Sequence, residues 1–540
     1  MTAELPSETA PSGQIKTDYT IGRDNIEGAI GPFGFDVHNP VFLISALAVI
    51  AFVVFTLALP EQASSLFSLL FSEVTKGFDW FFIGAADVFV LLCLVLIVSP
   101  YGKIRLGGQD ATPDFSYVSW FSMLFAAGMG IGLMFYGVSE PLSHFSSSLG
   151  GTAAGTDGLR TDWAPLGAAP SQAEAVRLGM AASIFHWALH PWAIYAILAL
   201  SLALFSYNKG LPLTIRSAFY PIFGERIWGW PGHIIDILAV FATLFGLATS
   251  LGLGAAQANA GLNKIFGIPI DTTSQIVLIV IITSIALFSV IRGLEAGVKL
   301  LSEINMGLAF LLLVFVLAAG PTLLLVTDAG DFLLAYLEYL PALSNPVGRD
   351  DVNFMQGWTS FYWAWWISWS PFVGMFIARV SRGRTVREFL VSVLLIPSLV
   401  CVIWMSIFGG AAISQVVRDG YTAATEAALP LQLFAMLNAL PMSQITSLVG
   451  IVLVIVFFVT SSDSGSLVID TITSGGKVDA PVAQRVFWCL FEGVIAIVLL
   501  LSAGGLKSLQ SMVISTGLPF TVVLLVMCVA IWRGLASEPR

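Results

Sequence analysis

Two groups of aromatic residues stand out within apolar stretches of this sequence. One lies in FHWALHPWAIY, residues 185–195, and the other in FYWAWWISW, residues 361–369. At about 100° per residue, the main aromatic side chains of each group share a face of a helix. Aromatic faces attract cations that cannot donate hydrogen bonds, such as quaternary ammonium and sulfonium groups. The residues that we expect to form an aromatic cage for such a cation are Trp187, Trp192, Tyr195, Trp366 and Trp369.

Interfacial aromatic belts are the alternative explanation for tryptophans in a membrane protein. Both groups lie well inside apolar runs, which favours a binding role. The surrounding residues 121–139, 183–206 and 358–380 contain no Asp or Glu. A cavity without a counter-ion suits a zwitterion, whose own carboxylate can lie against free backbone amides. We therefore expect a zwitterionic onium compound rather than a permanent cation.

The elements that position these side chains are predicted to be membrane-spanning helices. Of the 540 residues, 57% are hydrophobic and only 11% are charged, a composition outside the range of soluble globular proteins. Runs of about 20 apolar residues are long enough to cross a bilayer. We expect an all-α integral membrane protein with twelve transmembrane helices, at residues 41–59, 80–99, 117–138, 175–206, 232–262, 273–291, 300–327, 358–380, 387–411, 443–470, 483–502 and 508–532.

The charged residues predict how this chain lies in the membrane. Most of the 24 Lys and Arg residues fall on one side if both termini are cytoplasmic. The positive-inside rule therefore predicts that orientation, in a cell inner (plasma) membrane. The net charge of −10 argues against nucleic-acid binding. We expect the acidic N-terminal tail, which has little apolar material before Phe33, to be disordered.

Helix-breaking residues occur in the third and eighth spans. The third contains Gly128, Gly130 and Gly132, and the eighth contains Pro371 and Gly374. Non-helical backbone persists in a membrane only where it faces protein, water or a ligand. Because these spans are five apart, they predict two five-helix units of opposite orientation, an arrangement typical of secondary transporters. Glycine-mediated helix packing with one proline kink is the alternative.

This interpretation divides the chain into six parts. They are a cytoplasmic N-terminal tail (1–40), two spans outside the repeats (41–116), a first five-helix repeat (117–327), an amphipathic connecting helix (328–357), a second, inverted repeat (358–532) and a short C-terminal tail (533–540).

The segment GWTSFYWAWW, residues 357–366, resembles the signature of the betaine/carnitine/choline transporter family. The glycine run, the aromatic group of the fourth span and the later TSSDSGS follow in the order that this family shows. The resemblance implies a LeuT-like inverted repeat of spans 3–7 and 8–12, in a homotrimer, with Trp365 and the glycine segment also at the substrate. It further implies a sodium site. The residues that resemble its ligands are Ala126, Met129, Phe457, Thr460 and Ser461.

Sodium is therefore the expected coupling ion, with no other cofactor, for symport of glycine betaine or dimethylsulfoniopropionate. Carbonyls of an unwound segment and hydroxyls suit sodium, although intramembrane Ser and Thr also satisfy helix carbonyls. The resemblance makes Thr243 a candidate for a second sodium site. Leu247, one turn later, offers no oxygen there.

Other polar residues have side chains that could serve in catalysis or metal binding. Glu140, beside Pro141, is expected to end the third span near the outer interface. His186 and His190 stand four residues apart, and we favour packing or hydrogen bonding over metal binding. No hydrolase or zinc-protease motif occurs, so we do not expect an enzyme. Two alternatives stay open: a choline or carnitine carrier working by exchange or proton coupling, and a non-transporting onium sensor.

Overall fold

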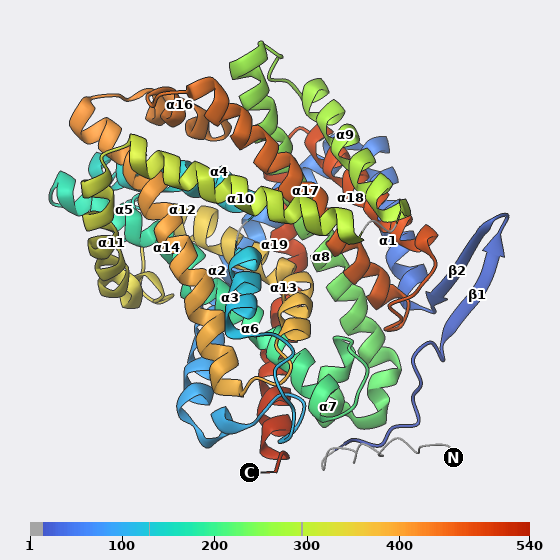
Figure 1. The fold of residues 1–540 in the computed structure, drawn as a ribbon. Helices are drawn as coiled ribbons and strands as arrows, with labels where there is room; N and C mark the ends of the chain where they lie inside the picture. Colours follow the sequence, from blue (N-terminus) through green and yellow to red (C-terminus); the bar gives the residue numbers. More distant parts are fainter. Residues whose placement is uncertain (1–13, 129, 293–294, 540) are drawn as a thin grey trace.

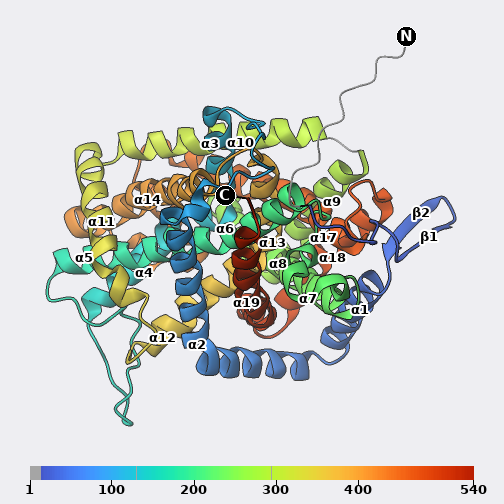
Figure 2. The ribbon, with the colours of Figure 1, turned by 90° about the horizontal axis from the view of Figure 1, so that it is seen from below.

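The computed structural model describes residues 14–128, 130–292 and 295–539. It is 77% helical and its only sheet within those residues is a two-stranded hairpin, so the expected all-α membrane class is confirmed. Figures 1 and 2 show a bundle of long helices. Its long helices are α1 (Val41–Ala58), α2 (Pro60–Val98), α3 (Tyr117–Gly128), α4 (Ile131–Gly150), α5 (Gln172–Trp187), α6 (Leu189–Ala203), α8 (Trp230–Phe266), α9 (Thr272–Arg292), α10 (Glu295–Ala319), α11 (Thr322–Leu343), α13 (Ser360–Val380), α14 (Val386–Asp419), α17 (Ser443–Thr473), α18 (Val482–Leu501) and α19 (Leu506–Ala536).

Short elements connect the long helices. They are α7 (Tyr220–Phe223), α12 (Val352–Phe354), α15 (Ala423–Glu426), α16 (Gln432–Asn438), the strands β1 (Asn25–Ile30) and β2 (Phe33–His38), the 3-10 turns η1 (Pro100–Lys103), η3 (Arg216–Phe219), η4 (Gly224–Trp228) and η6 (Leu429–Leu431), and the π-helical turns η2 (Leu204–Asn208) and η5 (Met355–Thr359).

Ten helical segments among the described residues are long and apolar enough to cross a membrane, and the bent pair α3–α4 makes an eleventh. The remaining predicted span corresponds to α13, which has 21 residues but is rich in polar and aromatic side chains. The count of twelve therefore stays a prediction. The inverted relation between the two groups of five helices likewise stays a prediction.

A bend interrupts the third span where the glycines predict it. Helices α3 and α4 meet at 63°, and Gly130 between them is fully extended, with φ −172° and ψ −176°. Met129, a predicted sodium ligand within this segment, lies outside the described residues. The glycine-rich segment thus changes the direction of the chain inside the apolar run.

The break expected in the eighth span is wrong, because α13 runs through Pro371 without interruption. A proline cannot donate to the carbonyl four residues earlier, which here belongs to Ile367. The Ser370 hydroxyl donates to that carbonyl instead, at 2.7 Å. This side-chain bond satisfies the freed acceptor and lets the helix continue.

The fourth span contains a helix break that the positions of glycine residues do not predict. Helix α5 ends at Trp187, and α6 begins at Leu189 after a non-helical Ala188 with φ −98° and ψ −116°. Pro191 cannot donate to the Trp187 carbonyl, so the helix cannot close across this point. The carbonyl becomes available to other donors at the centre of the bundle.

Helix α13 occupies the centre of the bundle, where it packs against α6, α8 and α19. The segment from α5 to η2 is the most buried span, with 94% of its most apolar window inside the molecule. Helices α1 and α10 lie at the periphery, with 28% and 22% of theirs buried. The first aromatic group therefore lies on the most buried of these spans, and the second lies on α13 at the centre of the bundle.

The described part of the N-terminal tail, residues 14–40, has a defined structure, which corrects the expectation of disorder there. Strands β1 and β2 form an antiparallel hairpin that projects from the edge of the bundle. Its base is held by polar contacts: Asp36 pairs with Lys477 at 2.5 Å, and Gln484 donates to the Asp36 carbonyl at 3.0 Å. These contacts fasten the hairpin to the connection between α17 and α18.

Candidate functional site: an aromatic box between two broken segments

The break between α5 and α6 brings four of the predicted cage residues together against α13. Trp187 closes α5, Trp192 and Tyr195 follow in α6, and Trp366 projects from α13. Centroids of the Trp187 and Trp366 rings lie 5.0 Å apart at 86°, and those of Tyr195 and Trp366 lie 5.7 Å apart at 85°. Trp192 packs on Tyr195 at 5.3 Å. We call these four residues the aromatic box.

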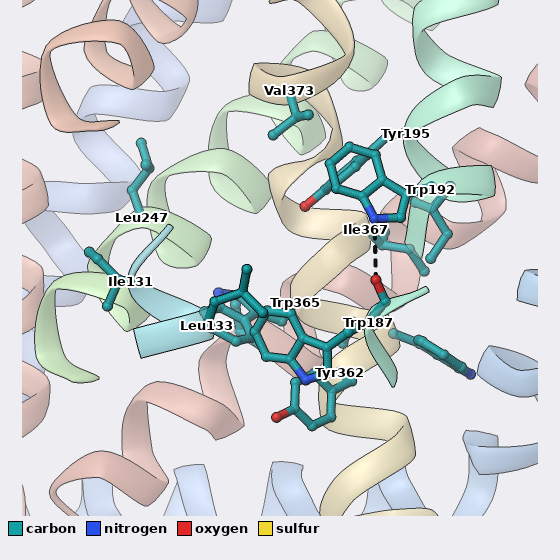
Figure 3. Close-up of a cluster of buried hydrophobic side chains, with 14 of the residues drawn as sticks. Ile131, Leu133, Trp187, Trp192, Tyr195, Leu247, Tyr362, Trp365, Ile367 and Val373 are labelled. Carbon is teal, nitrogen blue, oxygen red and sulfur yellow. Dashed lines mark hydrogen bonds between the residues drawn. The ribbon is translucent and has the colours of Figure 1, made fainter. Parts of the chain in front are cut away.

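Backbone carbonyls at the break orient two rings of the aromatic box. The Trp192 indole N–H donates to the carbonyl of Trp187 at 3.2 Å, the acceptor that Pro191 leaves free (Figure 3). The Trp366 indole N–H donates to the neighbouring carbonyl of His186 at 2.9 Å. The broken helix thus fixes both indoles through its own unpaired backbone groups.

Trp365 extends the aromatic box, whereas Trp369 lies apart from it. The Trp365 ring stacks beside Trp366 at 5.7 Å and 24°, and its N–H donates to Ser250 of α8 at 3.3 Å. Trp369 contacts Phe372 and faces Gly246 of α8, where an added Cβ would meet its ring at 3.0 Å. The shared helix face predicted for Trp366 and Trp369 therefore does not place both rings in one cluster.

The glycine segment meets the aromatic box at Gly132. A Cβ at this position would lie 2.5 Å from the Trp187 ring and 3.1 Å from the Trp365 ring, so only glycine fits between them. Gly130 has no neighbour within 4 Å of the corresponding position. Gly128 ends α3. The predicted substrate-facing role is thus supported by close contact only at Gly132.

Glu140 is the polar residue whose position the sequence misjudges. Pro141 suggested a helix end near the outer interface, yet α4 continues through both residues and the Glu140 side chain is completely buried. One carboxylate oxygen accepts from the Trp187 indole N–H at 2.7 Å and from the Tyr362 hydroxyl at 2.6 Å. The carboxylate therefore lies next to the aromatic box, at the N–H edge of the Trp187 ring.

Two histidines complete this polar cluster. The other carboxylate oxygen of Glu140 bonds His186 Nδ1 at 2.6 Å and His144 Nε2 at 3.2 Å. The His186 ring also stacks on Tyr362 at 4.7 Å and 17°. The oxygen and the two nitrogens lie within 4.8 Å of one another, a set of ligands that can hold a transition metal. In this arrangement the same atoms already hydrogen-bond one another.

The i, i+4 histidine pair serves two different partners. His186 bonds Glu140, and His190 bonds Asp87 of α2 at 2.9 Å. The helix break at Ala188 lies between them and turns their rings apart. Both histidines are thus hydrogen-bonded, as the sequence favoured, while the absence of a metal at His186 stays a prediction. An intramembrane acid four residues before a histidine, as in Glu140 and His144, is a sequence signal from which the buried cluster could have been predicted.

Those residues predicted to hold sodium that the structure describes lie on two helices, α3 and α17. On α17, the Thr460 hydroxyl donates to the carbonyls of Val456 and Phe457, each at 3.1 Å, and Ser461 is half-buried. A hydroxyl that donates within its helix keeps an oxygen lone pair for a cation. Ala126 is exposed on α3, which packs on α13 and α14. Met129 lies outside the described residues.

The second predicted sodium site has an apolar neighbour. Thr243 of α8 is buried and donates to the Ala239 carbonyl at 2.7 Å. Leu247, one turn later, covers Gly465 of α17, where an added Cβ would meet its side chain at 2.4 Å. Leu247 therefore fills space between α8 and α17 with hydrocarbon rather than with an oxygen ligand.

Comparison with known proteins agrees with the architecture of the bundle. The model of the betaine/carnitine/choline family transporters matches residues 40–540. A glycine betaine/proline/choline transporter of Vibrio parahaemolyticus is 62% identical over 98% of this chain and 96% of its own length. Glycine betaine transporter 1 of the same organism is 54% identical over 97% of each chain.

A more distant relative shows the same coverage. The glycine betaine transporter OpuD of Bacillus subtilis is 41% identical over 93% of this chain and 95% of its own length. Near-complete coverage at these identities leaves no part of the bundle outside the comparison. The chain therefore belongs to the betaine/carnitine/choline transporter family and is a multi-pass membrane transporter, not an enzyme.

Proposed function

We propose that this protein is a sodium-coupled symporter of a small zwitterionic onium compound, glycine betaine or dimethylsulfoniopropionate. The observation that carries the proposal is the meeting of Trp187, Trp192, Tyr195 and Trp366 at the break between α5 and α6. Ring faces around a methylated cation contribute about 0.5–2 kcal/mol each. The names of the Vibrio and Bacillus relatives, all of which include glycine betaine, support the same substrate class.

Choline is the second candidate substrate. One relative is named for glycine betaine, proline and choline together. The absence of acids in the sequence windows around the box argued against a permanent cation, but Glu140 lies one residue beyond the first window and is bonded to Trp187. The position of Glu140 therefore weakens the sequence argument against choline.

Substrate binding requires the aromatic box to open. At 5.0 Å and 86°, the Trp187 and Trp366 rings are in edge-to-face contact, so a trimethylammonium group must separate them. A cavity of about 370 Å³ lies near the Gly150 end of α4 and is lined in part by Trp163 and Trp358. In the predicted topology this is the outer side. Trp358 stacks on Tyr362 at 6.3 Å, which makes it the first ring between cavity and box.

Sodium coupling rests on the hydroxyls of α17 and the bend between α3 and α4. A bent segment exposes carbonyls, and Thr460 and Ser461 supply hydroxyl oxygens, which together match the preference of sodium. One sodium ion entering down about 100 mV and a tenfold gradient supplies roughly 3.7 kcal/mol, or about 500-fold accumulation. We further propose a homotrimer in the plasma membrane, with both termini cytoplasmic.

Counterflow in proteoliposomes tests the function directly. Vesicles loaded with unlabelled glycine betaine should take up labelled glycine betaine transiently, because a carrier exchanges internal unlabelled solute for external labelled solute without an imposed ion gradient. Dimethylsulfoniopropionate and choline, loaded in parallel, rank the substrate classes. Saturable binding without any exchange would contradict transport and favour an onium sensor.

A further inference from the structure

Glu140 holds a buried negative charge beside the aromatic box. Its side chain has no exposure, and its two oxygens face the four groups Trp187, Tyr362, His186 and His144. The indole N–H can only donate. With the Tyr362 hydroxyl and the two imidazoles also in place as donors, all acceptor positions of an ionised carboxylate are used. The hydrogen bonds thus fit the charged form of Glu140.

The histidine next to this carboxylate is arranged to be neutral. His186 faces Glu140 through Nδ1 and the Thr359 hydroxyl through Nε2, at 2.9 Å. Among the described residues, that hydroxyl has no other hydrogen-bond partner, so its proton is free to be donated to Nε2. Nδ1 then carries the single imidazole proton and donates to Glu140. A neutral His186 does not itself compensate the charge of the carboxylate.

The charge reaches the aromatic box through a single indole ring. Glu140 bonds the N–H edge of Trp187, and the same ring packs against Trp366 at 5.0 Å. The carboxylate also fixes Tyr362, whose ring lies 5.5 Å from Trp187 at 71°. The intervening groups are buried, so the charge is weakly screened at the position of a bound cation.

We propose that Glu140 is a specificity-determining residue: its carboxylate positions Trp187 and Tyr362 and provides the counter-charge for the onium head group. The inference rests on the proposed binding of an onium compound in the aromatic box. A zwitterion carries an anionic group that offsets part of this attraction, whereas choline depends on the protein for all of it. The Glu140 charge therefore broadens selectivity toward cations without a carboxylate.

The Glu140→Gln variant isolates the charge from the hydrogen bonds. The amide oxygen of Gln can accept from Trp187 and Tyr362, and its NH2 can donate to His186 Nδ1. His186 then carries its proton on Nε2 and donates it to the Thr359 hydroxyl. We expect the Kd of choline for purified protein to rise about tenfold or more and that of glycine betaine by less than about threefold. Equal changes for the two ligands, or no change, would overturn the proposal.

Two further variants complete the test. Asp87→Asn is the matched control, because it removes a carboxylate that bonds the other histidine, His190, and should leave the ratio of the two Kd values unchanged. If Glu140→Gln is not recovered from membranes, His144→Lys places a cation beside Glu140 and should lower choline affinity selectively. Loss of both ligands to the same extent in that variant also overturns the proposal. Wild-type protein that binds neither ligand would instead refute the proposed function itself.

Discussion

Each tryptophan of the aromatic box is held by different contacts, so each substitution removes a different set of interactions. Trp366 is bonded to a backbone carbonyl at the helix break and touches two other box rings. Trp369, one turn later on α13, faces α8. We therefore expect Trp366→Ala to weaken glycine betaine binding by about 1–3 kcal/mol, through loss of one cation–π face and its buried area.

Equilibrium binding to purified protein checks this prediction. Trp369→Ala is the matched comparison and should have the smaller effect, since its ring contacts Phe372 rather than the aromatic box. Both variants should retain the melting profile of a folded bundle. Unchanged glycine betaine affinity in a well-folded Trp366→Ala protein would contradict the assignment of the aromatic box as the substrate site.

The two α17 hydroxyls carry the sodium prediction. Replacing Thr460 and Ser461 together by Ala removes two oxygen ligands but no aromatic surface. The sodium concentration for half-maximal uptake should rise at least about tenfold, since that corresponds to only about 1.4 kcal/mol of lost binding. Substrate affinity at saturating sodium should change little, and at low sodium it should fall, because linkage is reciprocal.

Thr446→Ala provides the control on the same helix, since its hydroxyl likewise donates to carbonyls of its own turn. Uptake measured over a sodium titration with ionic strength held constant separates the variants. A sodium dependence that is identical in the wild type and the double variant would remove both residues from the site.

At the level of elements, the glycine segment and the broken α5–α6 helix meet at one crowded point. A methyl group at Gly132 would lie 2.5 Å from the Trp187 ring, whereas one at Gly130 would meet nothing within 4 Å. Gly130 has an extended backbone that alanine also adopts. Gly132→Ala should therefore displace Trp187 and reduce glycine betaine affinity by about tenfold, as expected for about 1–3 kcal/mol of overpacking.

Gly130→Ala is the matched variant and should bind substrate nearly as the wild type does. Tryptophan fluorescence of the two proteins reports whether the ring environment has moved. If Gly132→Ala behaves like Gly130→Ala in both binding and fluorescence, the glycine segment does not meet the box as described.

The N-terminal hairpin gives a pH-dependent element outside the membrane. Burial, followed by the Arg216 guanidinium and then His233, lowers the pKa of His38 from 6.5 to about 3. Arg216 donates to His38 Nε2 at 3.3 Å and is itself paired with Asp236 at 2.5 Å. Asp24 lies 3.8 Å from the same nitrogen and is partly exposed. The docked hairpin therefore holds His38 in its neutral form.

Because the docked pKa lies below the free value, the stabilisation is complete above pH 6.5. It decreases as pH falls from 6.5 toward 3. At pH 5 the docked state should lose about 2 kcal/mol. The hydrogen-exchange protection factors of residues 25–38, corrected for the intrinsic exchange rate at each pH, should therefore be lower at pH 5 than at pH 7.5. A His38→Gln variant should lose most of this pH dependence. Protection factors that are equal at both pH values in the wild type would contradict docking through a neutral His38.

At the scale of the whole molecule, hydrophobic length and helix periodicity were enough to predict an all-α membrane bundle and most of the aromatic box. Trp187, Trp192 and Tyr195 could be grouped from spacing because they follow one another closely in the chain. The continuity of α13 could not, because it depends on Ser370 capping the Ile367 carbonyl. That contact is a rotamer choice, which sequence pattern alone does not specify.

The Glu140 cluster shows the second limit of sequence reasoning. Its donors come from α5 and α13, so its burial follows from packing among three helices rather than from local pattern. Pro141 suggested a helix end, but proline is accommodated inside α4. The hairpin was missed for a similar reason: its polar residues are satisfied by Lys477 and Gln484, more than 400 positions away.

Sodium-gradient-driven uptake of labelled glycine betaine into proteoliposomes tests the central claim most directly. The membrane potential is held constant with potassium and valinomycin. In the control, external sodium is replaced by N-methylglucamine rather than by choline, which is itself a candidate substrate. The account predicts accumulation above the external concentration only with an inward sodium gradient, and its loss in Trp366→Ala protein. Uptake that is indifferent to sodium, or undiminished in that variant, would contradict sodium-coupled transport through the aromatic box.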